Sequence, residues 1–283
     1  MADNYLENKM EEYRRRQGAN STMSRKVSPT LRPGEIRMKF PPRRVFVTGG
    51  ANGIGRAVVK AFADAGCKVA FCDIDRRQGP LTAQSTGSKF YPVDVTDTEA
   101  LHQCMLSIFR DWGDIDILIN NVGICDFCPL TQTTVERFDR VINTNLRPVF
   151  ITARALAIYR ESLQERPTYG RIINISSTRA IMSEPDTESY TAAKGGVLSL
   201  THALMMSLAH LNITVNCVSP GWIATHDGEV HTSEDVSQHP SRRIGKTSDV
   251  VAAIMWLALP DNDFINGENI VIDGGMTRRM MYV

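Results

Sequence analysis

The sequence SYTAAK, residues 189–194, places a tyrosine and a lysine four positions apart. On a helix, residues at this spacing lie one above the other, so the side chains of Tyr190 and Lys194 would be neighbours. A free phenol has a pKa of about 10 and is a weak base at neutral pH. Because a nearby positive charge favours the phenolate, the pair could transfer protons. It could equally be an ordinary surface turn, and the rest of the chain has to decide between the two.

A second candidate site is the glycine-rich stretch TGGANGIG, residues 48–55. Glycine lets backbone N–H groups approach a phosphate, and the start of the following helix adds partial positive charge. Asp73 ends the next apolar run, 20 residues after Gly53. A carboxylate at that point can accept hydrogen bonds from the hydroxyls of an adenosine ribose. The pattern therefore predicts a dinucleotide site, with a tight turn between strand and helix as the alternative.

The same residues predict which dinucleotide binds. The carboxylate of Asp73 would repel the 2′-phosphate of NADP, and Asn52, just before Gly53, is not basic. Arg76 and Arg77 follow Asp73 closely and could offset part of its charge. We expect NAD as the cofactor, with NADP as the less favoured alternative.

Six cysteines are scattered along the chain, and only Cys125 and Cys128, in CDFC, lie close together. A single C-x-x-C without a second pair of ligands is weak evidence for a metal or redox site. We interpret these two residues as part of a loop and expect no metal. A thiol redox or metal-binding protein remains a competing hypothesis.

Apolar runs alternate with helical patterns from Arg44 onward. Such alternation implies right-handed crossovers and a parallel sheet that is covered on both faces. We predict an α/β fold, a single doubly wound, Rossmann-like domain with a seven-stranded parallel sheet and helices on both faces. The predicted strands are RVFVTGG (44–50), KVAFCDID (68–75), KFYPVDV (89–95), DIDILINNVG (114–123), RIINISS (171–177), ITVNCVSPG (213–221) and ENIVIDGG (268–275), and helices include residues 54–65, 100–112 and 191–211.

Charge separates the chain into a domain and an extension. Residues 1–44 hold eleven Lys and Arg against five Asp and Glu, a net charge of +6, and the remainder carries −5. We assign residues 1–43 as a basic N-terminal extension and residues 44–283 as the domain. Without a recognisable nucleic-acid module, we do not expect nucleic acid as a partner. No apolar run is long enough for a membrane span and no signal-peptide core is present, so we expect a cytoplasmic protein without membrane contact.

The motifs, taken together and in order, resemble the short-chain dehydrogenase/reductase family over residues 44–283. The turn Gly49-x-x-x-Gly53-x-Gly55 is similar to the cofactor turn of that family. NNVG (120–123) resembles its NNAG motif, with Val122 in place of alanine. Ser177 stands thirteen residues before Tyr190, which opens a Y-x-x-x-K motif, and SPGWIAT (219–225) resembles the loop that holds the nicotinamide.

The resemblance implies a set of catalytic roles. Tyr190 would be the general acid or base for a secondary alcohol or ketone, and Ser177 would polarise the substrate oxygen. Lys194 would bind the nicotinamide ribose and, with the oxidised ring, lower the pKa of Tyr190 from about 10 towards 7. Asn145 would complete a proton relay through Lys194 and water.

The resemblance also implies the cofactor-binding residues. Pro220 and Gly221 would shape the turn beneath the nicotinamide, and Ile223 and Thr225 would bond its carboxamide. The implied set is Gly49, Asn52, Gly53, Ile54, Gly55, Asp73, Ile74, Asp94, Val95, Asn121, Gly123, Tyr190, Lys194, Pro220, Gly221, Ile223 and Thr225.

Pro148 lacks an N–H, so the carbonyl of Thr144 loses its helical partner. We expect a kink beside Asn145 that frees backbone acceptors for the relay water. A straight, fully hydrogen-bonded helix over residues 140–152 would contradict this.

The substrate is the least determined part of the prediction. Residues 224–240 should form a mobile substrate lid, and their polar composition favours a small sugar, polyol or hydroxy acid. Cys125, Phe127, Met182 and Trp222 could instead line an apolar pocket. Hydroxysteroid or 3-oxoacyl reductase activity, or a dinucleotide-binding protein without turnover, are the alternatives. The apolar helix after Tyr190 and the tail MMYV (280–283) suggest a homotetramer, the usual state in the family.

Overall fold

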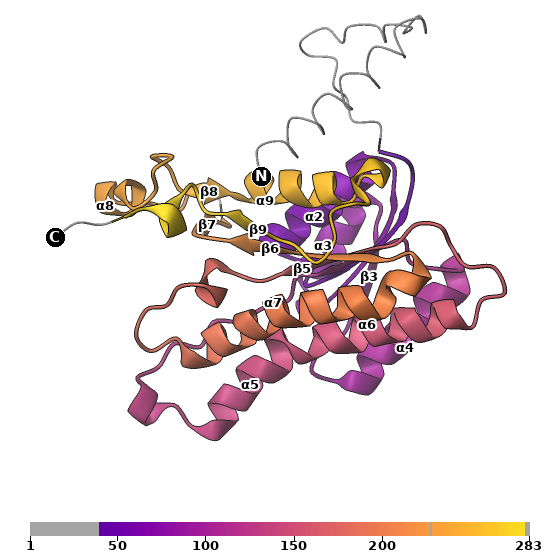
Figure 1. Ribbon diagram of the computed structural model, residues 1–283, viewed down its shortest axis with the longest axis horizontal. Coiled ribbons are helices and arrows are strands. Elements are labelled where there is room, and N and C mark those ends of the chain that lie inside the picture. Colours follow the sequence, from indigo (N-terminus) through magenta and orange to yellow (C-terminus); the bar gives the residue numbers. More distant parts are fainter. Residues whose placement is uncertain (1–39, 227, 281–283) are drawn as a thin grey trace, which may run out of the picture. The chain divides into compact units, whose positions relative to one another are not determined.

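The structure is a computed structural model that describes residues 40–226 and 228–280 (Figure 1). The N-terminal extension lies outside the described residues except for its last four positions, and so do the final three residues of the apolar tail. The described part begins at Phe40, whose ring packs edge-on against Phe62 with the centroids 5.5 Å apart. Residues 40–43 therefore contact the domain.

Seven parallel strands form the central sheet in the order β3-β2-β1-β4-β5-β6-β9, which confirms the predicted fold class. The chain runs outward from β1 to β3 and then returns to β4 on the other side of β1. In doubly wound sheets, ligands bind outside the carboxyl ends of the strands at this reversal. The strands are β1 (Arg44–Thr48), β2 (Lys68–Asp73), β3 (Lys89–Pro92), β4 (Ile117–Asn120), β5 (Arg171–Ile175), β6 (Thr214–Pro220) and β9 (Asn269–Ile272).

Helices cover both faces of the sheet, as Figure 1 shows. One face carries α2 (Gly53–Asp64), α3 (Gln78–Thr86) and α9 (Thr247–Leu257). The other carries α4 (Thr98–Trp112), α5 (Val135–Asn145), α6 (Arg147–Glu161) and α7 (Glu188–Leu208). After β6 the chain forms a short strand, β7 (Ile223–Ala224), which pairs in parallel with β8 (Gly245–Lys246). The helix α8 (Ser233–Ser237) lies between these two strands in the sequence.

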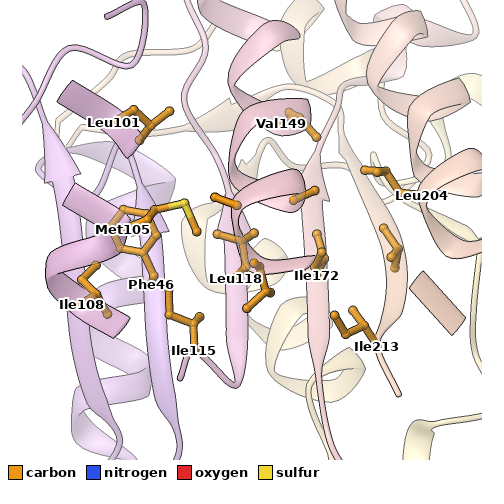
Figure 2. Packing of buried hydrophobic residues seen from close by; sticks show 14 of the residues in the cluster. Phe46, Leu101, Met105, Ile108, Ile115, Leu118, Val149, Ile172, Leu204 and Ile213 are labelled. Atoms are coloured by element: carbon orange, nitrogen blue, oxygen red, sulfur yellow. The ribbon is translucent and has the colours of Figure 1, made fainter. Parts of the chain in front are cut away.

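Alternate residues of each strand supply two separate cores. In β1, Phe46 packs with α4 and α6 on one face, whereas Val45 and Val47 pack with α2 on the other. Figure 2 shows the first of these cores, in which Phe46 and Leu118 of the sheet meet side chains of the helices that cover them. Since both sides of a strand are buried, the strands read as continuous apolar runs in the sequence.

A chain of buried polar side chains crosses beneath the site. Thr152 of α6 donates to Asn120 of β4 at 2.7 Å, and Asn120 donates to Asn174 of β5 at 2.9 Å. Asn174 in turn donates to Thr201 of α7 at 3.0 Å. Because unpaired polar groups are costly in a core, this chain favours one position of α7 on the sheet. It therefore helps to place the residues that α7 carries.

The predicted interruption at Pro148 is confirmed, and it takes the form of a break between two helices. Helix α5 ends at Asn145, Leu146 adopts φ −112°, and α6 begins at Arg147. Pro148 then lies in the first turn of α6, where a missing N–H does no harm. The break leaves Asn145 at the end of α5.

Arg160 at the end of α6 is fully buried and bonds that helix to the segments that lead into β4 and β5. Its guanidinium forms an ion pair with Asp114 at 2.9 Å and donates to the carbonyls of Ile115 and Tyr169. Asp114 is itself 2 % exposed. A buried pair of this kind tolerates the loss of neither partner, because the remaining charge keeps its desolvation cost.

We expect Arg160→Met to lower the free energy of unfolding by about 3–5 kcal/mol, because Asp114 loses its main buried partner. Arg154 lies on the same helix and is exposed, so Arg154→Met should change it by about 0.5 kcal/mol or less. Urea unfolding followed by circular dichroism measures both. Equal losses in the two variants would show that the buried pair has no special role.

Candidate active site

A cavity of about 560 Å³ lies at the carboxyl ends of the strands, where the strand order reverses. It brings together every residue that the sequence predicted for cofactor binding, together with Ser177, and Asn145 does not line it. The lining also contains residues outside the predicted set, namely Val93, Val122, Ile124, Cys125, Thr144, Ile175, Ser176 and His226. Val122 and Cys125 belong to the motifs NNVG and CDFC, whereas Val93 and Ile124 are apolar residues that no motif singles out.

The glycine turn is shaped for a close approach from the cavity side. Gly49 and Gly53 have φ +70° and +53°, which most L-residues avoid. A Cβ on Gly55 would lie 1.9 Å from the carbonyl oxygen of Gly49, so a side chain cannot fit there. The amide of Asn121 donates to the carbonyls of Thr48 and Gly49 and fixes the turn to the end of β4. The first turn of α2 lines the cavity with Gly53, Ile54 and Gly55.

Asp73 ends β2 at one end of this cavity. Its carboxylate accepts hydrogen bonds from the backbone N–H of Ala51 at 2.9 Å and of Asp75 at 3.0 Å. Asp75 in turn accepts from the side-chain amide of Asn52 at 2.9 Å. Asp75, which no motif singles out, puts a further carboxylate beside this end, although it does not line the cavity. Lys194, at the opposite end, is the only Lys or Arg among the described residues that line the cavity.

Tyr190 and Lys194 lie one turn apart near the start of α7, as their spacing predicted. The lysine ammonium is 5.8 Å from the centroid of the tyrosine ring and donates to the carbonyl of Ile175 at 2.8 Å. Ser176 holds the same turn by donating to the backbone carbonyl of Lys194 at 2.7 Å. The lysine side chain is only 2 % exposed, so its charge lies inside the protein.

The expected lowering of the tyrosine pKa is wrong for the protein chain alone. Burial, and then the neighbouring Cys125, raise the pKa of Tyr190 to about 12, while a hydrogen bond with Ser177 acts in the opposite direction. Burial lowers the pKa of Lys194 to about 8. Desolvation disfavours the charged form of each group, and it is the largest effect on both pKa values.

Asn145 lies behind the cavity and makes a reciprocal pair with the backbone of Ile124. Its side chain accepts from the Ile124 N–H at 2.8 Å and donates to the Ile124 carbonyl at 2.9 Å. A Cβ on the preceding residue, Gly123, would lie 3.1 Å from the lysine ammonium and 3.8 Å from the Asn145 oxygen. Asn145 thus positions the loop that borders Lys194, and its part in a proton relay stays a prediction.

Cys125 lines the cavity and is exposed, whereas Cys128 is buried, and both are free thiols. Within residues 40–226 and 228–280, no group of three or more His, Cys, Asp or Glu side chains is arranged to hold a metal ion. The helices of that same part of the chain include none that is both long and apolar enough to cross a membrane.

Comparison with known proteins agrees with this geometry. A family model described as enoyl-(acyl carrier protein) reductase matches residues 49–277. An uncharacterized oxidoreductase of Thermotoga maritima is 36% identical over 250 residues, which are 83% of this chain and 96% of that protein. The 3-oxoacyl-[acyl-carrier-protein] reductase FabG of Haemophilus influenzae is 34% identical over 237 residues, 82% of this chain and 96% of that protein.

Solved structures show the same fold. An apo SCOR enzyme from Clostridium thermocellum superposes with a TM-score of 0.76 at 37% identity, over 85% of this chain and 95% of that one. ElxO with NADP bound has a TM-score of 0.77 at 30% identity, and 4-hydroxyisoleucine dehydrogenase complexed with NADH has 0.74 at 30%. Each of these two matches covers 84% of this chain and 100% of the other.

Fold, cavity and relatives define a doubly wound, nucleotide-binding oxidoreductase that acts on CH–OH or C=O groups. The chain belongs to the short-chain dehydrogenase/reductase family, whose members use NAD or NADP.

The buried lysine predicts a pH dependence of stability. Below pH 8 both the folded and the unfolded chain hold the proton of Lys194, and the folded state bears the full cost of the buried charge. Between its folded pKa of about 8 and its ordinary value of 10.5, only the unfolded chain holds that proton, so raising the pH stabilises the fold. The gain should reach about 3 kcal/mol.

We expect this gain to be absent from Lys194→Met and present in Lys60→Met, which alters an exposed lysine. Urea unfolding between pH 7 and pH 10.5 measures the difference between each variant and the natural protein, so that other titrating groups cancel. A parallel pH profile for Lys194→Met and the natural protein would contradict the buried-charge account.

Proposed function

We propose that the protein is an NAD-dependent dehydrogenase that interconverts a secondary alcohol and a ketone. The observation that carries this is the grouping of Ser177, Tyr190 and Lys194 at one end of a cavity whose other end is the carboxylate of Asp73. One cavity thus holds groups for moving a hydroxyl proton and a group suited to an adenosine ribose.

In this mechanism the dinucleotide, when bound, supplies the hydride acceptor or donor. The residues Gly49, Gly53 and Gly55, which carry no side chain, would let its pyrophosphate approach the start of α2. Lys194 would bond the nicotinamide ribose. Its pKa of about 8 leaves the amine mostly protonated at neutral pH.

Proton transfer would take place at the hydroxyl of Tyr190. Ser177 would donate a hydrogen bond to the substrate oxygen and stabilise the charge that develops on it. Because burial raises the pKa of Tyr190, the chain alone does not provide the phenolate, and positive charge bound in the cavity would have to offset that burial. The active form is therefore expected to arise with the oxidised cofactor in place.

Preference for NAD is supported by the charge of the adenosine end. Asp73 and Asp75 both lie there, and no arginine of the described chain lines the cavity. A 2′-phosphate requires a cation as its partner. The two carboxylates would repel it.

Reduction of a 3-oxoacyl group is a second candidate. It is supported by the name of the Haemophilus influenzae relative and by the exposed ring of Phe127, which packs edge-on against Tyr190 with the centroids 5.9 Å apart. The reacting groups would be the same, and the direction of hydride transfer would be reversed.

We also propose a homotetramer that uses the helical face formed by α6 and α7. Phe150 and Ile158 of α6 are 51% and 47% exposed, and Met206 of α7 is 73% exposed. Exposed apolar side chains of this size are typical of protein interfaces. Residence in the cytoplasm stays a prediction.

Tyr190→Phe should lower kcat by at least about 100-fold, because the group that moves the hydroxyl proton is lost. The expected readout is NADH absorbance with a panel of secondary alcohols and sugars. Tyr159→Phe, which removes a phenol that donates to the carbonyl of Gly113, is the matched control and should retain activity. If Tyr190→Phe turned over at the natural rate, another group would have to be the base.

Asp73→Ser should reverse part of the cofactor preference. Loss of charged hydrogen bonds to the ribose lowers kcat/KM for NAD by roughly 10- to 100-fold, while NADP loses a repulsive partner. Initial rates with both cofactors on the same alcohol give the ratio. An unchanged ratio would mean that Asp73 does not face the ribose.

A further inference from the structure

Arg179 is a charged residue of the site region that the motifs leave without a role. It lies in a short helical turn, Thr178–Ala180, directly after Ser177, and its backbone N–H donates to the Ser177 hydroxyl at 3.2 Å. This bond fixes the start of the arginine side chain relative to the proposed reacting centre. The side chain itself is 21% exposed.

Arg179 is not among the residues that line the cavity, but its positive charge lies close to the proposed substrate end. It acts against the dominant effect of burial on two residues that line the cavity, lowering the pKa of both Tyr190 and Cys125. The other cation there, Lys194, is buried and donates to the Ile175 carbonyl. Arg179 is therefore better placed than Lys194 to meet a substrate anion at this end.

The present partner of Arg179 is a replaceable one. Its guanidinium pairs with Glu184 at 2.5 Å, but the Glu184 side chain is 68% exposed. Exposed ion pairs contribute little because water competes for both charges. A carboxylate that enters the less solvated cavity can take the place of Glu184 and pair with the Arg179 guanidinium.

The loop that carries both residues is held in a strained position beside the cavity. Asp186 adopts φ +67°, which is uncommon for a residue other than glycine, and its carbonyl accepts from the N–H of Cys128 at 3.2 Å. This bond joins the loop after Ser177 to the loop that presents Phe127. Backbone strain of this kind clusters at binding sites.

Apolar side chains complete the same region. Phe127 is 51% exposed and lies edge-on to Tyr190, and Ile181 and Met182 follow Arg179 with exposed side chains. One loop thus offers a cation and the other an aromatic ring, both close to Tyr190. A fully polar sugar would leave these apolar groups without a partner.

We propose that the substrate is a short hydroxy acid, or the corresponding oxo acid, that carries an apolar substituent, and that Arg179 binds its carboxylate. Glu184 occupies the guanidinium until the substrate arrives. Since Arg179 is two residues from Ser177, their Cα atoms are at most about 7 Å apart, so the carboxylate lies within a few carbons of the carbinol. This inference rests on the proposed dehydrogenase function and specifies its substrate class.

The test compares acids with their neutral counterparts. NADH formation is measured with lactate, 3-hydroxybutyrate and mandelate, and with the primary amide of each, so that only the charge differs within a pair. The natural protein should show a higher kcat/KM for the acid than for its amide. The ratio of the two values is the readout, because general damage to the fold lowers both members of a pair.

Two variants with opposite expected effects separate substrate binding from loop stabilisation. Arg179→Gln should reduce the acid-to-amide ratio by on the order of 10- to 100-fold, mainly through KM, and Arg179→Lys should retain part of it. Glu184→Gln should raise the ratio, because it removes the competing carboxylate. If the pair only stabilised the loop, both glutamine variants would lower activity on acid and amide alike, and the proposal would be overturned.

Failure of this proposal is distinguishable from failure of the proposed function. Turnover of neutral alcohols with an acid-to-amide ratio near one would reject the hydroxy acid and leave the dehydrogenase intact. If no alcohol is oxidised, calorimetry of pyruvate, acetoacetate and phenylglyoxylate with the NAD-loaded protein still tests the carboxylate site. Binding that Arg179→Gln abolishes would support the site, and absence of binding would reject it.

Discussion

A single buried cation sets the requirements that the rest of the site has to meet. The ammonium of Lys194 is removed from water and keeps one protein acceptor, the carbonyl of Ile175. The end of β5, the Ser176 bond to the lysine backbone and the absence of a side chain at Gly123 all serve to place it. The polar chain that ends at Thr201 holds the same helix further along. A cation in such a position destabilises the fold and is retained where a bound ligand needs it.

The pKa values indicate what the protein alone provides for proton transfer and what a bound cofactor would have to add. Burial raises the pKa of Tyr190 and lowers that of Lys194, so it disfavours the charged form of each group, although the lysine amine stays mostly protonated at neutral pH. A phenol held in this way is a poor base until positive charge and substrate enter the cavity. Under the proposed mechanism, proton transfer is thereby coupled to cofactor binding, because the same desolvation that suppresses the phenolate also strengthens its attraction to a bound cation.

The proposed substrate end of the cavity differs in its contacts from the proposed cofactor end. At the cofactor end, backbone groups and the fixed carboxylate of Asp73 form a shape that is already complete. At the substrate end, Arg179 has an exposed partner and Asp186 a strained backbone, so that region is built from contacts that can be exchanged. One fold can support different substrates, as the names of the relatives indicate.

The seven strands, the glycine turn and the Tyr190–Lys194 spacing were predictable from the sequence, because each depends on residues that are close together in the chain. Proline chemistry likewise predicted the interruption before Pro148, though not its form as two separate helices. Only the tertiary structure decided the direction of the Tyr190 pKa, the pairing of Asn145 with Ile124 and the position of Asp75. These properties depend on burial and on contacts between distant segments. Local patterns carry no information about how much water a side chain loses when the sheet and its helices close around it.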